Sequence, residues 1–260
     1  MLGTDMPNTV IREDVADEFI WSTIETTRNA EGVITDRTTT FDDGRVRNET
    51  FEEGVRISLL WTDENDVKSW ESQTLTYDTN GQLLSRSTVG DDGVLRDDHY
   101  QDGVRTRTEQ SDPADTKSWG SIQTFYDADG AFAYQFRYDD SGVEWTTYAT
   151  PDGGRSIGLW DRFDAFEWES KARVKDSEGN TVFRNRFDDN DDATVWIHSL
   201  DEDPDLDIIL RKDGDGSDPW LATATFYDDA GRVDYVETYM TRGDVPDEYA
   251  SALNLLAFAF

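Results

Sequence analysis

A 49-residue internal repeat constrains the fold of this chain more than any other feature of its sequence. Tryptophan recurs at intervals of 49, 49, 49 and 52 residues, and a glycine stands eleven residues after each one. The tryptophans are Trp21, Trp70, Trp119, Trp168 and Trp220, and the glycines are Gly32, Gly81, Gly130, Gly179 and Gly231. Self-similarity at a period of this size is typical of solenoids, propellers and repeat arrays. The sequence therefore predicts about four and a half equivalent units.

Turn chemistry within the repeat indicates β-hairpins. Asparagine or aspartate stands three residues before each of these glycines. In a turn of this kind the Asn or Asp side chain forms a hydrogen bond with the backbone two residues later, and the glycine adopts the left-handed conformation. A second glycine follows in four copies, and Asp191 replaces it in the fourth copy. These second glycines are Gly44, Gly93, Gly142 and Gly243. Segments such as AFAYQFRY (131–138) separate the turns and alternate as strands do, at about four strands per unit.

The predicted fold is therefore all-β. We expect an antiparallel meander that forms an open twisted sheet or solenoid over residues 19–245. A β-propeller is the alternative, since propeller blades also contain four strands. Four and a half units close a ring awkwardly, which favours the open sheet.

The two ends of the chain depart from the repeat. Residues 1–18 form a leading arm, in which NTVI is a possible edge strand. The amphipathic segment 246–260 has helical periodicity, and we expect a short helix that folds back over the exposed sheet edge. Leu256 and Phe260 would be buried beneath it.

Three copies of the turn share a further motif. The segments are LTYDTNGQLL (75–84), TFYDADGAF (124–132) and TFYDDAGRV (225–233). They resemble the Y-D-x-x-G-R-L core of RHS/YD repeats, which line large β-sheet shells in secreted bacterial toxins and surface proteins. The first and fourth copies depart from it, with Arg28-Asn29 and Lys175-Asp176 in place of Tyr-Asp. The resemblance implies a shell-like or surface-exposed sheet, and it brings no catalytic residues.

Charge limits the classes of partner. The net charge is −33, and yet 12% of the residues are aromatic, which favours a folded protein with an acidic surface over a disordered one. No basic stripe is visible in the sequence, so we expect no nucleic-acid partner and no anionic membrane surface. No segment is long and apolar enough for membrane insertion. Cations, basic proteins and neutral glycans remain.

Sequence features say less about the cellular location. The chain has no cysteine, which excludes disulfides and thiolate metal sites. The N-terminus shows no classical signal peptide. We nevertheless expect an extracellular or cell-surface protein, because an acidic coat suits salt water or calcium-rich surroundings.

Residues that could carry catalysis are few. His99 and His198 are the two histidines, and no repeated feature supports either, so we interpret both as ordinary polar strand residues. Tryptophans outside the repeat register are better candidates for ligand binding, because a pyranose face packs on a flat ring. They are Trp61, Trp145, Trp160 and Trp196. Packing against a neighbouring strand is the alternative role.

A candidate calcium loop lies in the segment RKDGDGSD. It offers Asp213, Asp215, Ser217 and Asp218, which resemble the front half of an EF-hand or dockerin-type loop. The bidentate glutamate expected at the twelfth position is missing, since Ala224 stands there. Solvated turns are the alternative interpretation. Calcium is therefore a possible cofactor.

Three functions follow as expectations. The first is a non-enzymatic bacterial repeat protein that acts as a surface, secreted or particle-associated binding or structural module, with a glycan or protein partner. The second is a polysaccharide-active enzyme or carbohydrate-binding module with a groove lined by Trp and Asp. The third is an acidic inhibitor or nucleic-acid mimic that binds a basic protein.

Overall fold

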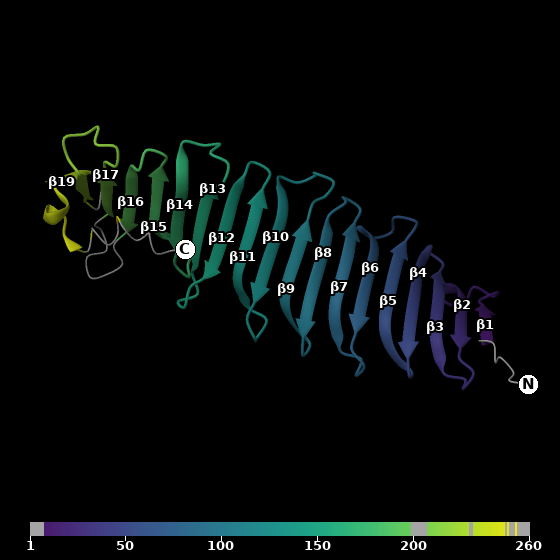
Figure 1. Ribbon diagram of the computed structural model, residues 1–260. Coiled ribbons are helices and arrows are strands. Elements are labelled where there is room, and N and C mark those ends of the chain that lie inside the picture. The colour runs from purple at the N-terminus through teal and green to yellow at the C-terminus, as the bar shows by residue number, and fades with distance from the viewer. Residues whose placement is uncertain (1–7, 199–206, 229–230, 248, 250–252, 254–260) are drawn as a thin grey trace, which may run out of the picture. The chain divides into compact units, whose positions relative to one another are not determined.

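Antiparallel strands joined by short turns make up most of the chain in the computed structural model. In the ranges that the structure describes there are nineteen strands in an open antiparallel meander, and within residues 1–133 and within residues 134–260 each strand pairs with the next one in sequence (Figure 1). The described residues are 8–198, 207–228, 231–247, 249 and 253. The chain divides into two compact units, residues 1–133 and 134–260.

Residues of the first unit form ten described strands. They are β1 (Asn8–Glu13), β2 (Trp21–Arg28), β3 (Ile34–Phe41), β4 (Arg45–Glu52), β5 (Val55–Asp63), β6 (Trp70–Tyr77), β7 (Leu83–Gly90), β8 (Leu95–Gln101), β9 (Val104–Ser111) and β10 (Trp119–Tyr126). The expected edge strand NTVI lies within β1, all of whose residues are exposed.

Strand β11 (Phe132–Asp139) begins at the end of the first unit and leads into the second. It is followed by β12 (Val143–Ala149), β13 (Arg155–Asp161), β14 (Trp168–Lys175), β15 (Thr181–Asp188), β16 (Ala193–His198), β17 (Asp207–Lys212), β18 (Ala222–Tyr227), β19 (Val233–Tyr239) and the 3₁₀ turn η1 (Arg242–Asp244). A repeat tryptophan begins β2, β6, β10 and β14, so each complete repeat contains four strands, as predicted.

Pairing continues across the repeat boundaries. Ser58–Thr62 of β5 pairs with Ser72–Thr76 of β6, and the same holds for β9 with β10, β13 with β14 and β17 with β18. Propeller blades are separate sheets, so this continuity excludes the propeller alternative. The prediction of an open antiparallel sheet is confirmed.

The predicted turn mechanism is present in the structure. One carboxylate oxygen of Asp78 accepts hydrogen bonds from the backbone N–H groups of Asn80 and Gln82, at 2.9 and 2.8 Å. Gly81 has φ +81°, in the left-handed region that favours glycine. In the fourth copy Asp191 adopts this conformation in place of glycine, with φ 68°. Gly243 departs from the pattern, because it lies in η1.

A second aspartate closes the longer loop before each repeat tryptophan. Its side chain accepts a hydrogen bond from the backbone N–H of the residue five positions later, which fixes the loop. These aspartates are Asp14, Asp63, Asp112, Asp161 and Asp213. All of them stand seven residues before a repeat tryptophan.

The first unit is a single-layer sheet. Extensive contacts join only consecutive strands, and most of the strand residues are half-buried. With no second layer among the described residues to cover it, the sheet is covered by its own long side chains.

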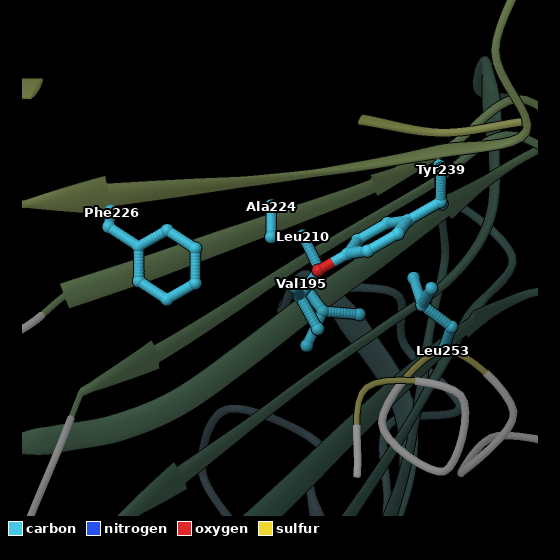
Figure 2. Packing of buried hydrophobic residues seen from close by; sticks show 7 residues of the cluster. Val195, Leu210, Ala224, Phe226, Tyr239 and Leu253 are labelled. Atoms are coloured by element: carbon cyan, nitrogen blue, oxygen red, sulfur yellow. The ribbon is translucent and has the colours of Figure 1, made fainter. Parts of the chain in front are cut away.

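Apolar packing is denser in the second unit, on one face of β16–β19. Val195 and Leu210 are almost completely buried there, beside Phe226 and Tyr239 (Figure 2). Leu253, from the C-terminal segment, is buried against this cluster.

The predicted C-terminal helix is only partly within the described residues. Tyr249 packs on Phe226, with ring centroids 6.3 Å apart, and with the buried Leu253 it brings the segment onto the sheet face. Leu256 and Phe260 lie outside the described residues. In the part of the chain that the structure describes, we find no helix that has the length and apolar character to span a membrane.

Candidate ligand-binding site

An aromatic hollow lies on one face of β11–β14 in the second unit. It has a volume of about 520 Å³, within the range of small-molecule sites. Its lining residues are Phe136, Glu144, Thr146, Tyr148, Trp160, Asp161, Arg162 and Glu169. The strand register explains why they meet, since Phe136 pairs with Thr146 and Glu144 pairs with Trp160 across adjacent strands.

A glycine positions the indole of Trp160. Gly158 lies two residues earlier on the same face of β13, and a Cβ atom there would be 2.3 Å from Cη2 of Trp160. The indole therefore lies against the backbone of its own strand, in space that the side chain of any residue larger than glycine at position 158 would occupy. Tyr148 packs against Tyr134 and Phe136, with ring centroids 5.9 and 6.5 Å away.

Charged groups surround these rings. Glu144 is buried and forms an ion pair with Arg162, whereas Glu169 is exposed. Asp161 both lines the hollow and accepts backbone hydrogen bonds from its loop at Phe163 and Phe166. Aromatic surface with carboxylates and a guanidinium beside it can bind a ligand that has apolar faces and many hydroxyl groups.

The other tryptophans outside the repeat register are not part of this hollow. Trp145 lies on the opposite face of the second unit, because it pairs with Leu159, the neighbour of Trp160 on β13. Trp196 lies on that opposite face too, because its cross-strand row runs through Arg184 and Arg173 to Ile157. The Trp145 indole donates a hydrogen bond to Asp139 at 2.8 Å, and Arg184 lies 4.6 Å from the Trp196 ring centroid.

Trp61, in the first unit, is stacked on Phe41 with centroids 5.3 Å apart, and Arg45 and Arg47 lie over its ring. Of the four predicted platforms, the structure places Trp160 in a hollow.

Tryptophans in the repeat register have a mixed environment. Trp168 is buried, with 8% of its surface exposed, and stacks on Phe166. Trp21, Trp70, Trp119 and Trp220 are only half-buried. Their shared role is to begin a strand or to precede one, next to the loop that the preceding aspartate closes.

Three carboxylates form a candidate metal centre between the turn after β15 and the loop after β17. Ligand oxygens of Asp192, Asp213 and Asp215 lie within 4.8 Å of one another. The hydroxyl of Ser217, together with its backbone N–H, lowers the pKa of Asp215 by hydrogen bonding. Oxygen ligands of this kind suit calcium.

The predicted calcium ligands are only partly brought together. Asp213 and Asp215 are members of the cluster, and Asp192 is a member that the sequence analysis did not include. The backbone N–H groups of Ser217 and Asp218 donate to Asp215 and Asp213, which are contacts within the loop. Asp213 is also the loop-closing aspartate of its repeat, so Asp192 and Asp215 are the members specific to this cluster.

Both histidines lie on strands of the sheet. His99 Nε2 lies 3.2 Å from a carboxylate oxygen of Glu109, beside Arg107. His198 is at the end of β16, paired with Asp207 across the strands.

Two arginine clusters on the first unit were missed by the sequence analysis. Glu49 is buried and forms ion pairs with arginines from β3, β4 and β5. Asp98, which is fully buried, forms ion pairs with arginines from β7, β8 and β9. The arginines are Arg37, Arg47 and Arg56 around Glu49, and Arg86, Arg96 and Arg105 around Asp98.

Hydrogen bonds determine the charge state of Asp98. Burial on its own raises the pKa of this carboxyl, but hydrogen bonds from Arg96, Thr108 and Arg86 outweigh burial and lower the pKa to about 2. The carboxylate is therefore ionised at neutral pH, and each cluster has three guanidinium groups for one carboxylate.

The sequence shows no basic stripe along the chain, and yet six arginines lie on one face of the first unit. Strand register brings them together from six different strands. The signal was present in the sequence, because the three arginines of the first cluster recur 49 residues later in the second, where Asp98 stands in place of Glu49.

Comparison with known proteins adds no family. The chain matches no protein-family model, and no curated protein matches it.

Proposed function

We propose that this protein is a non-catalytic glycan-binding module at the cell surface or outside the cell, and that the hollow around Trp160 is its binding site. The observation that carries the proposal is the arrangement of Trp160, Tyr148 and Phe136 around one hollow with Glu144, Glu169 and Arg162 beside them. A pyranose ring presents C–H groups to the aromatic rings and hydroxyl groups to the carboxylates.

The open sheet supports a module of this kind. A single-layer sheet exposes long faces to solvent, and shallow sites on such faces suit extended polymers. The acidic surface keeps the protein soluble and favours a neutral ligand at this site over a dense polyanion.

Affinity electrophoresis through gels that contain neutral polysaccharides tests the proposal. We expect at least one neutral polysaccharide to retard the protein, and Trp160→Ala to abolish the retardation. Trp145→Ala is the matched control, because Trp145 lies on the opposite face of the same sheet and should leave retardation unchanged.

Gly158→Ala tests the geometry without removing an aromatic ring. The added methyl group displaces the indole, so we expect weakened binding with little change in unfolding temperature. Cleavage of the polysaccharide by the purified protein would contradict the non-catalytic assignment, and the absence of retardation in all gels would contradict glycan binding.

A further inference from the structure

We propose that one face of the first unit is a second binding site, which binds a carboxylate-bearing polysaccharide. We call it the arginine-bearing face, since it carries the six arginines around Glu49 and Asp98. The proposal does not depend on the Trp160 hollow, and it rests on the two clusters around Glu49 and Asp98. Each has a net charge of about +2 when its carboxylate is ionised, on a chain whose total charge is −33.

One cross-strand row connects the clusters. Its members pair directly from β3 to β10, so all of them project from the same face. In order they are Arg37, Glu49, Leu59, Leu75, Arg86, Asp98, Thr108 and Thr124. The repeat places the two carboxylates four strands apart, or about 19 Å at the usual strand spacing.

A β-bulge at the same place in each repeat aims one arginine at each carboxylate. Pairing shifts between Thr50 and Phe51 on β4, and 49 residues later between His99 and Tyr100 on β8. Bulges re-aim side chains, and these ones bring Arg56 and Arg105 to the arginine-bearing face.

Tyrosines of the Y-D motif support these two arginines. The guanidinium of Arg56 lies 4.7 Å from the ring centroid of Tyr77, and that of Arg105 lies 4.2 Å from the ring centroid of Tyr126. A guanidinium stacked on a ring keeps its N–H groups at the edge, where they can donate to a ligand carboxylate.

The remaining donors are accessible. The six arginine side chains are between 30% and 39% exposed, although the carboxylates that they surround are buried. A ligand carboxylate can therefore bind to the arginines of either cluster and neutralise part of the positive charge that the buried carboxylate leaves.

Charge spacing favours an acidic polysaccharide over nucleic acid. Duplex nucleic acid carries about one charge per 1.7 Å, which the rest of this acidic chain repels. A polyuronate has one carboxylate per sugar, and its sugar rings can lie over the apolar pair Leu59 and Leu75 between the clusters.

The test is affinity electrophoresis with polygalacturonate at several sodium chloride concentrations, with fully methyl-esterified polygalacturonan as the uncharged probe. We expect the protein to bind polygalacturonate and not the ester. The double variant Arg56→Gln/Arg105→Gln should bind at least tenfold more weakly, and thermal melts check that it is folded, since each buried carboxylate keeps two arginines.

Arg107→Gln is the matched control. Arg107 lies on β9, two residues from Arg105, but on the opposite face beside Glu109. We expect Arg107→Gln and Trp160→Ala to retain polygalacturonate binding, which separates this site from the hollow.

Four outcomes would overturn the proposal. They are no binding of polygalacturonate, equal binding of the methyl ester, an equal loss with Arg107→Gln, and tighter binding of a single-stranded oligonucleotide than of polygalacturonate.

Discussion

Asp98 shows how single residues stabilise the first unit, whose described residues form one layer of strands. Its carboxylate is fully buried and accepts hydrogen bonds from Arg86, Arg96 and Thr108 at 2.7 to 3.2 Å. Removing one partner of a buried ion pair typically costs about 3–5 kcal/mol, because the remaining charges lose their counter-charge. We expect Asp98→Asn to lower the free energy of unfolding by this amount in urea titrations. Asp97→Asn, on the opposite face, should cost much less, and equal losses would contradict the role of Asp98.

Acid should weaken the same site. The folded-state pKa of Asp98 is about 2, below the ordinary value of 3.8. The ionised carboxylate therefore adds to the free energy of unfolding, fully above pH 4, and this stabilisation is lost as the pH falls through 2. The shift corresponds to about 2 kcal/mol at neutral pH. Urea unfolding at pH 7, 4 and 2.5 should therefore show this loss in the wild type and not in Asp98→Asn. A parallel loss in both proteins would mean that other groups are responsible.

At the scale of strands and turns, much of the structure could be predicted from the sequence. Tryptophan spacing and Asp-x-x-Gly turns specify where strands begin and end, because both are local chemistry. The two β-bulges could not be predicted. Their extra residues are Ile57 on β5 and Thr106 on β9, and each shifts the side-chain alternation of its strand. Which arginines share a face therefore becomes evident only from the register.

The C-terminal segment gives a test at this scale. Leu253 is buried against the apolar cluster of β16–β19, and we expect Leu253→Ala to lower the free energy of unfolding by about 2–3 kcal/mol. Leu84, which is 46% exposed on β7, is the control, and Leu84→Ala should change stability by less than about 0.5 kcal/mol. A small effect at both positions would contradict docking of the segment.

The acidic loops give a second test. If Asp192 and Asp215 help to bind calcium, millimolar calcium should raise the melting temperature, and Asp192→Asn/Asp215→Asn should remove the rise. Asp66→Asn/Asp115→Asn makes the same charge change in loops of other repeats and should retain it. An equal rise with sodium chloride at matched ionic strength would show that calcium acts only by screening.

At the scale of the whole molecule, charge is sorted by position in the repeat. Carboxylates gather in the turns. Desolvation is the larger cause that raises the pKa of Asp91, and repulsion from neighbouring acids such as Asp66 raises it further. The pKa values of Asp42 and Asp189 are raised for the same two reasons. Arginines gather on the strands. Net charge and composition predict an acidic surface but not this sorting. The Trp160 hollow was equally hidden, because it depends on Gly158 and on pairings between four strands.

Hydroxyl-radical footprinting tests the central claim, ligand binding at the Trp160 hollow on one face of β11–β14, most directly. Side-chain oxidation is measured with and without the neutral polysaccharide that retards the protein most strongly. We predict protection of Trp160 and Tyr148 on binding, with no change at Trp145 and Trp196 on the opposite face. Protection of Trp145 and Trp196 without protection of Trp160, or no protection at any of the four, would contradict the account.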